Sequence, residues 1–322
     1  AEPGLITQAI GATNIPIETI EKICGELLRK MKIELAIPGL LMIDSPGHAA
    51  FMTLRKRGGA ISDLATLVID INEGFQEQTD ESLAILKQFK VPFVVAATKI
   101  DKIPGWYAFP DSCFLDSFEK QREDVKEELE KKVYRIVSQL AERGFDSERF
   151  DRIKDFKRNV AIVPVSGVTG EGIPDLLMIL AGLAQQFLKE RLLLSKQAKG
   201  SILEVKEVTG LGTTIDVILY DGCLEKNDYL IIGGKEPIVT KIRALLLPPP
   251  LKELRVEKKF LQVDKVSAAV GIKIVAPNLE NAIAGSPIIA VKNEDEIEKA
   301  KELLKKEVEE VQFEKHIEGV IA

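Results

Sequence analysis

Short apolar runs alternate with amphipathic stretches along the first part of the chain. The runs are too short for core helices and are typical of fully buried strands, at 40–43, 64–71, 92–97 and 161–165. Between them, apolar residues recur at helical spacing, at Ile17, Ile20, Cys24, Leu27 and Met31, at Val125, Leu129, Val133, Ile136 and Leu140, and at Leu176, Leu180, Leu183 and Phe187. This alternation predicts an α/β domain with a mostly parallel sheet covered on both faces. Ligands bind such sheets at the carboxyl ends of strands, so we expect the chemistry in the loops after Ile43, Ala97 and Val165.

The pattern changes at Lys199 to short alternating strands separated by glycine turns. The strands are expected at 201–208, 213–219, 228–232, 238–245, 270–276 and 288–291, with a hairpin turn at Asp221-Gly222. This pattern is typical of a small β-barrel, from which a loop at 248–259 should protrude because consecutive prolines cannot join a central ladder. Residues 295–311 predict a helix with one apolar stripe, whose partner is either the barrel or something beyond the chain. We therefore expect three parts, at 1–196, 197–292 and 293–322, the last being a helical connector to a further domain.

Composition narrows the classes of function. Of the 322 residues 45% are apolar, which suffices for two compact cores, and the formal net charge is −6. An acidic chain does not hold nucleic acid by a bulk positive field, so any RNA contact should be local. The three cysteines lie far apart without CxxC spacing, which favours neither disulfides nor structural zinc and suits a reducing compartment. We expect a cytoplasmic monomer that does not bind membranes.

Three loops contain residues suited to nucleotide chemistry. Asp44-Ser45-Pro46-Gly47-His48 directly follows the first predicted strand, where a carboxylate can hold magnesium and the Gly47 amide can approach a phosphate. Thr98-Lys99-Ile100-Asp101 follows the third strand; the Asp101 carboxylate can accept hydrogen bonds from N1 and N2 of guanine, and the Lys99 stem can cover the base. After the fourth strand, backbone amides of Ser166 and Gly167 can contact the O6 atom of guanine, with Ser166 bracing Asp101. The competing interpretations are an Asp-Ser-Pro-Gly turn for the first loop, a charged strand-to-helix loop for the second, and a Gly-rich loop with helix-capping chemistry for the third.

The order of these loops resembles the third, fourth and fifth sequence boxes of GTPases, and His48 narrows the resemblance to translation factors. Segments 6–12, 15–17 and 51–63 look like archaeal and eukaryotic initiation factor five B, a family related to bacterial initiation factor two. Residues 210–214 and Gly222 resemble that family's second domain. The resemblance therefore implies a P-loop-type GTPase domain followed by a translation-factor β-barrel.

The resemblance also implies roles at particular positions. Thr7 would belong to switch I, where it meets magnesium and the γ-phosphate, and Asp44 would hold the same metal. His48 would be the catalytic residue that orients the attacking water. The ligands implied are GTP or GDP with Mg²⁺. Nucleotide-binding residues are expected at Asp44, Gly47, Thr98, Lys99, Asp101, Ser166 and Gly167.

The sequence departs from the family pattern in four places. Thr98 stands where the family has Asn, and a hydroxyl has fewer hydrogen-bonding groups than an amide, which favours weaker guanine affinity. Gly167 replaces the usual Ala, and Ala9 replaces a common His. The phosphate-loop pattern GxxxxGK[ST] does not occur, and the pair Gly234-Lys235 is followed by Glu236. We expect that residues preceding Ala1 supply this loop.

These observations predict a translation initiation GTPase that switches between GTP and GDP states and promotes joining of ribosomal subunits. The ribosome is the implied partner, while initiator tRNA and other initiation factors would be engaged through regions beyond this chain. One alternative is an elongation-type or selenocysteine-type factor, which shares the box at Asp44 and the barrel. Another is a nucleotide-free binding module with a GTPase-like fold, which the missing phosphate loop and Thr98 favour.

Overall fold

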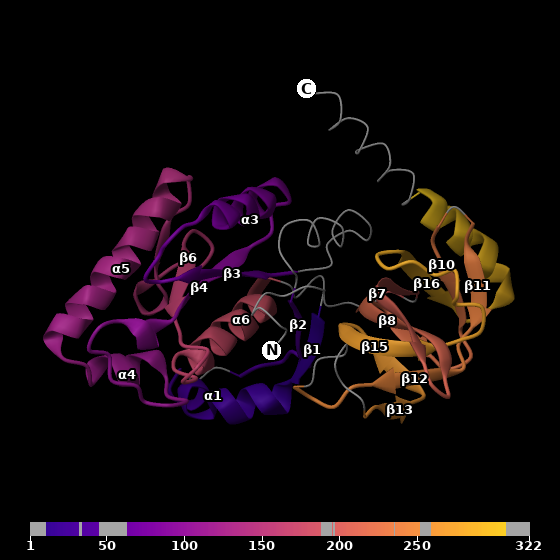
Figure 1. Ribbon diagram of the computed structural model, residues 1–322, viewed down its shortest axis with the longest axis horizontal. Coiled ribbons are helices and arrows are strands. Elements are labelled where there is room, and N and C mark those ends of the chain that lie inside the picture. Colours follow the sequence, from indigo (N-terminus) through magenta and orange to yellow (C-terminus); the bar gives the residue numbers. More distant parts are fainter. Residues whose placement is uncertain are drawn as a thin grey trace, which may run out of the picture. The chain divides into compact units, whose positions relative to one another are not determined.

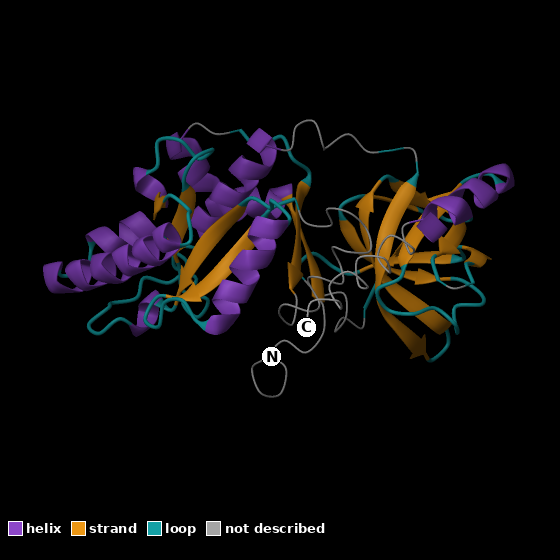
Figure 2. Cartoon of the chain, turned by 90° about the horizontal axis from the view of Figure 1, so that it is seen from above, coloured by secondary structure: helices purple, strands orange, loops and turns teal. Residues whose placement is uncertain are grey.

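The computed structural model describes residues 11–31, 34–44, 63–187, 195, 197–234, 236–251 and 259–306 (Figure 1). These residues form two compact units. The parallel-sheet unit contains 16–39 and 63–187, and the barrel unit contains 11–15, 40–44 and the residues from 195 onward. Helices gather in the first and strands dominate the second (Figure 2). None of the described helices is long and apolar enough to cross a membrane.

The parallel-sheet unit has one four-stranded sheet, in the order β3-β4-β6-β5, in which all three strand pairs are parallel. Its elements in chain order are α1 (Ile17–Met31), β3 (Ala65–Asp70), α3 (Glu77–Gln88), β4 (Phe93–Thr98), η1 (Ile100–Lys102), α4 (Phe114–Glu119), α5 (Glu123–Glu142), β5 (Ser147–Arg149), η2 (Phe150–Arg152), β6 (Val160–Pro164) and α6 (Ile173–Phe187). This alternation of strand and helix confirms the predicted α/β fold.

The apolar pattern explains the core of this unit. Strand β4 is buried from Phe93 to Ala97 because it lies between two neighbours, as its uninterrupted apolar run predicted. Helix α5 buries the whole predicted stripe, which consists of Val125, Leu129, Val133, Ile136 and Leu140. Helices α1 and α6 also pack against each other. Of their predicted stripes, Ile20 and Cys24 in α1 and Leu180 and Leu183 in α6 are buried, whereas Ile17, Leu27 and Leu176 are half-buried.

Helix α5 is preceded by a separate short helix, α4. The chain leaves the helical conformation at Arg122, whose ψ is 153°. Just before this break, the Gln121 side chain donates to the carbonyls of Tyr107 and Ser117 and accepts from the Tyr107 amide. Gln121 therefore ties the break between the helices to a loop earlier in the chain.

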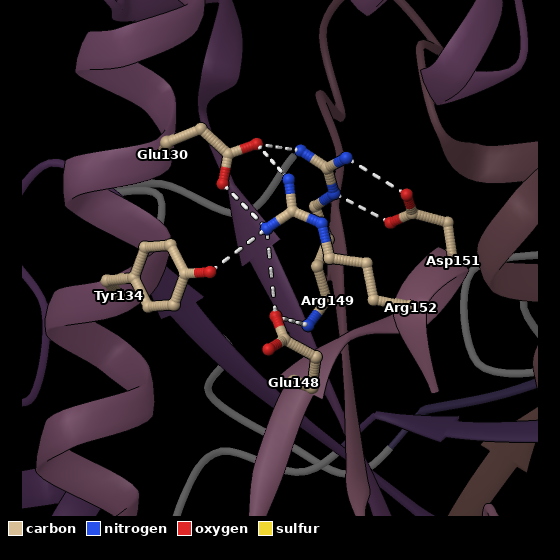
Figure 3. A network of polar contacts seen from close by, with 6 residues as sticks. All are labelled: Glu130, Tyr134, Glu148, Arg149, Asp151 and Arg152. Atoms are coloured by element: carbon tan, nitrogen blue, oxygen red, sulfur yellow. Dashed lines mark hydrogen bonds and ion pairs between the residues drawn. The ribbon is translucent and has the colours of Figure 1, made fainter. Parts of the chain in front are cut away.

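The edge strand β5 is only three residues long and is fastened by Arg149, its last residue. The buried Arg149 guanidinium pairs with Glu130 of α5 and makes two bonds to Asp151, of 2.6 and 2.9 Å (Figure 3). Arg152 Nη2 lies 2.6 Å from the same Glu130 carboxylate. The guanidinium of Arg149 also lies over the rings of Phe114 and Phe118. Charge pairing and ring contacts together hold the edge of the sheet.

The barrel unit is built on an eight-stranded antiparallel sheet, in the order β11-β10-β16-β7-β8-β15-β12-β13, with a separate pair β14-β9. Its strands are β7 (Ala198–Val208), β8 (Gly212–Asp221), β9 (Cys223–Glu225), β10 (Tyr229–Ile232), β11 (Ile238–Lys241), β12 (Ala244–Leu247), β13 (Leu261–Val263), β14 (Lys265–Ser267), β15 (Val270–Val275) and β16 (Pro287–Val291). The predicted barrel-like domain is therefore present. The single strand predicted at 238–245 is instead two strands, which separate at Ile242 and Arg243.

The predicted strand at Leu40–Ile43 exists as β2 (Gly39–Asp44), but its predicted place was wrong. Among the described residues it pairs only with β1 (Gly11–Pro16), and its residues are half-buried or exposed. Leu41 and Ile43 pack with Ala12 against Ile218 of the barrel. An apolar run indicates that a strand is covered but does not identify the covering residues. Here the outer face of the barrel covers it, so β1 and β2 share a core with the barrel.

The apolar stripe near the C-terminus finds its partner in the barrel. After η3 (Glu294–Glu296), helical residues 297–306 place Ala300 and Leu304 in a cluster with Ile231, Ile289 and Val291. The stripe residues Val308 and Val311 lie outside the described residues. Burying Leu304 fully contributes on the order of 2 kcal/mol. The described part of this helix is therefore docked on the barrel.

Candidate nucleotide-base site

The loops that follow β4 and β6 lie together because these strands are parallel neighbours. Their pairing is Val95 with Ile162, Ala96 with Val163 and Ala97 with Pro164. Backbone bonds continue past the strand ends, since Val165 N donates to Ala97 O at 2.8 Å and Ile100 N donates to Val165 O at 3.4 Å. The two segments predicted to read a base, 98–101 and 166–167, are thus brought to one edge of the sheet, as expected for an α/β ligand site.

The predicted contact between Ser166 and Asp101 is present. The buried Ser166 hydroxyl donates to Asp101 Oδ1 at 2.6 Å. The same hydroxyl oxygen accepts the amides of Val168 and Thr169, at 3.2 and 3.1 Å, so it is fixed by the turn that follows. Among the described residues, no donor is recorded for Asp101 Oδ2. The carboxylate is therefore oriented through one oxygen and can accept through the other.

The two loop amides differ in what they can offer a ligand. Ser166 N, one of the two amides expected to contact O6 of guanine, donates to Glu171 O at 2.9 Å within the loop. The amide of exposed Gly167 has no recorded acceptor in the described part of the chain. No atom would lie within 4 Å of a Cβ added at Gly167, so the position is open. Only the Gly167 amide therefore remains as the donor beside Asp101.

Lys99 is held by residues that the sequence analysis did not include. Its Nζ lies 2.7 Å from Asp70 Oδ2, at the end of β3. Asn72 donates to Asp70 Oδ1 through its amide at 2.9 Å, and its side-chain nitrogen also donates to Lys99 O at 3.1 Å. These bonds support a left-handed backbone at Lys99, where φ is 65°. Asp70 is the last residue of β3 and lies one residue before the end of the strand predicted at 64–71, and the carboxyl end of a buried strand is the sequence signal that marks such a position.

The charges of this pair stabilise one another. Burial alone would raise the pKa of Asp70, but hydrogen bonds from Lys99 and Asn72 outweigh burial and hold that pKa below its ordinary value. The hydrogen bond and charge of Asp70 raise the pKa of Lys99. The pair therefore stays ionised through the neutral pH range. The Thr98 hydroxyl, where the family pattern has Asn, donates across the strand to Ile69 O at 3.2 Å.

The remaining predicted site residues are not among the described residues of the parallel-sheet unit. Asp44 ends β2 in the barrel unit and is exposed. Thr7, Gly47 and His48 lie outside the described residues. Within the ranges that the structure describes, no cluster of three or more His, Cys, Asp or Glu side chains forms a metal site.

Comparisons with known proteins find similar sequences and a similar solved structure. Residues 7–186 match the family described as "Elongation factor Tu GTP binding domain". A protein of Ignicoccus hospitalis named "Probable translation initiation factor IF-2" is 57% identical over 324 residues, which cover 99% of this chain and 53% of that protein. The "Crystal structure of GDP-bound aIF5B from Aeropyrum pernix" is 52% identical with a TM-score of 0.86, over 96% of this chain and 52% of that one. The chain spans about half the length of these proteins.

A more distant solved structure shares the fold alone. The apo form of translation elongation factor SelB from Methanococcus maripaludis is 18% identical with a TM-score of 0.53, over 86% of this chain and 53% of that one. Its sequence identity to this chain is about a third of the identity between this chain and the Aeropyrum pernix initiation factor. The similarity at the level of sequence therefore favours initiation factors over the selenocysteine-type alternative.

Proposed function

The chain belongs to the family of the elongation factor Tu GTP binding domain, and from this premise we propose that it is a translation initiation GTPase whose base site is formed by the ends of β4 and β6. The observation that carries the proposal is the hydrogen bond from Ser166 to Asp101, which presents an oriented carboxylate beside the open Gly167 amide. Guanine has two adjacent N–H donors next to a carbonyl oxygen. The Asp101 carboxylate as acceptor and the Gly167 amide as donor complement that edge of guanine. Adenine does not present the same arrangement of donors and acceptor.

The residues present fit the base chemically. Asp101 accepts from N1–H and N2–H of guanine, and the Gly167 amide donates to O6. Ser166 keeps the carboxylate oriented before the nucleotide arrives, which lowers the entropy lost on binding. The aliphatic stem of Lys99 covers the base plane, and the 2.7 Å contact between its ammonium group and Asp70 supports this role by restricting the side chain.

The proposed phosphate contacts come from Thr7, from Asp44 at the end of β2, and from the residues that follow it. Thr7 and Asp44 would hold Mg²⁺, which takes oxygen ligands, keeps several waters and is commonly bound by one or two protein groups together with substrate phosphates. The Gly47 amide would approach a phosphate. His48 would orient the water that attacks the γ-phosphate, since in such enzymes catalysis consists mainly of positioning and charge stabilisation.

The proposed cellular role is that of the named relatives. GTP would order the segments around Thr7 and His48, and hydrolysis would release them, which biases the position of the barrel. The partner proposed is the ribosome, at the joining of its subunits in the cytoplasm. Initiator tRNA and other initiation factors would be engaged by regions outside this chain, which itself would act as a monomer.

Equilibrium binding tests the proposal directly. A fluorescent guanine nucleotide is titrated with this chain in the presence of Mg²⁺, and competition with unlabelled GDP, ADP and xanthosine diphosphate ranks the bases. Saturable binding with GDP well ahead of ADP is the expected result. Absence of saturable binding would instead favour the nucleotide-free interaction module.

A further inference from the structure

A fully buried carboxylate, that of Glu171, lies in the loop that follows β6, five residues after Ser166. Its Oε1 atom accepts from Phe109 N at 3.0 Å, from Trp106 Nε1 at 3.2 Å and from the Ser117 hydroxyl. Its Oε2 atom accepts from the Thr169 hydroxyl at 2.6 Å. Among the described residues no cation pairs with it. The donors to its oxygens are instead neutral groups.

These donors come from two separate parts of the chain. Thr169 belongs to the base-site loop itself, whereas Trp106, Phe109 and Ser117 lie in the loop after η1 and in α4. A buried carboxylate without these bonds would be costly, so the carboxylate holds both parts in place. One side chain therefore joins the loop that carries Ser166 to a segment more than 50 residues earlier.

The backbone continues this connection to Asp101. Glu171 O accepts the Ser166 amide at 2.9 Å, and the Ser166 hydroxyl donates to Asp101. Two further bonds join the same segments, from Asp111 N to Thr169 O at 2.9 Å and from Gly172 N to Ser112 O at 3.0 Å. The conformation of Ser166, which orients Asp101, is thus linked through Glu171 to the indole of Trp106.

We propose that Glu171 is a positioning residue for guanine recognition, and that its carboxylate couples occupancy of the base site to Trp106. This inference rests on the proposed function, because it assigns Glu171 to the same base site. Glu171 does not touch the base. It keeps the Ser166 hydroxyl where it orients Asp101, and any shift of the loop when a base binds changes the hydrogen bond between Glu171 and the indole.

The test compares GDP with inosine diphosphate, which lacks the 2-amino group that Asp101 accepts. In Glu171→Ala, the Ser166 hydroxyl no longer holds the Asp101 carboxylate in its orientation. The affinity for GDP should therefore fall about tenfold, and the affinity for inosine diphosphate should fall less. Glu171→Gln should restore most of the preference, because its amide oxygen can still accept from Trp106, Phe109 and Ser117. Asp175→Asn, which alters another fully buried carboxylate outside the loop, is the matched control and should keep the preference for GDP.

A second measurement needs no variant. Trp106 is the only tryptophan, so ¹⁵N-labelled protein gives a single indole N–H signal. This signal should move during GDP titration with the same saturation curve as binding. Failure of the unmodified chain to bind GDP would refute the proposed function. Normal binding with a stationary indole signal, or an unchanged preference in Glu171→Ala, would refute the role of Glu171 alone.

Discussion

Asp175 provides the sharpest test of how the parallel-sheet unit is held together. Its carboxylate lies in the first turn of α6 and is fully buried. Oδ2 accepts the amide of Phe114, the first residue of α4, at 2.7 Å, whereas Oδ1 has no hydrogen-bond partner among the described residues. Burial raises the pKa of Asp175 from 3.8 to about 6, and the bond from Phe114 opposes this rise only in part. Asp175 therefore binds a proton more tightly in the folded protein than in the unfolded chain.

The sign and size of the effect follow from this difference. Between about pH 4 and pH 6 the folded state binds more protons than the unfolded state, so the free energy of unfolding falls as pH rises. A shift from 3.8 to about 6, at about 1.36 kcal/mol per pKa unit, corresponds to about 3 kcal/mol. Asp175→Asn cannot titrate, and its amide oxygen can still accept from Phe114. The stability of the variant relative to the native protein should therefore rise by up to about 3 kcal/mol across this range.

Urea unfolding followed by Trp106 fluorescence measures the relevant transition, because the single tryptophan lies in the parallel-sheet unit. Both proteins are unfolded at about pH 4, 5, 6 and 7, and the difference between their free energies is plotted against pH. Glu127→Gln, which neutralises an exposed carboxylate on α5, is the control and should give a flat difference. A flat difference for Asp175→Asn would refute the argument that burial controls this carboxyl group.

Other substitutions test the loops, the edge strand and the proposed chemistry. Gly167→Ala should stabilise the protein by up to about 1 kcal/mol and keep nucleotide affinity. Gly170→Ala should destabilise it by more than about 1 kcal/mol, because φ is +78° and the new Cβ would clash with the Asp111 carboxylate. Urea unfolding measures both changes. Arg149→Met should cost about 3 kcal/mol or more in the same assay, because two carboxylates lose their buried cation. Asp101→Asn should shift preference from guanine to xanthine nucleotides in competition binding, and an unchanged preference would remove Asp101 from the base site. His48→Ala should slow ribosome-stimulated GTP hydrolysis without weakening nucleotide binding, and an equal loss of both would remove its catalytic assignment.

The parts of the base site that could be predicted are those encoded by local pattern. The apolar runs at 92–97 and 161–165 identify strands, and parallel strands bring their carboxyl ends together, so Asp101 and Ser166 were expected to meet. Glu171 could not be identified in the same way. An acidic residue between two glycines is normally exposed, and its burial depends on donors such as Trp106 and Phe109 that are distant in sequence.

The errors in the fold have related physical causes. The run at Leu40–Ile43 has the same composition as a central strand, but composition does not specify the pairing partner, which is β1 among the described residues. Strands β9, β13 and β14 were missed because three residues cannot show an alternating pattern. The break between α4 and α5 depends on Gln121, whose side chain bonds to a distant backbone segment that the helical pattern does not include.

The position of β2 bears on how a nucleotide switch would reach the barrel. Asp44 ends this strand, and Leu41 and Ile43 of the same strand pack with Ala12 against the fully buried Ile218. Close-packed apolar contacts resist separation, so a displacement of β2 is transmitted to β8 of the barrel. Asp44, one of the residues proposed to act at the phosphates, therefore ends a strand that shares a core with the barrel. The base site depends on separate contacts, between β4 and β6 and through Glu171, all within the parallel-sheet unit. Under the proposed function, recognition of the base and the response to the γ-phosphate would therefore depend on different packed clusters, and substitutions in one should leave the other intact.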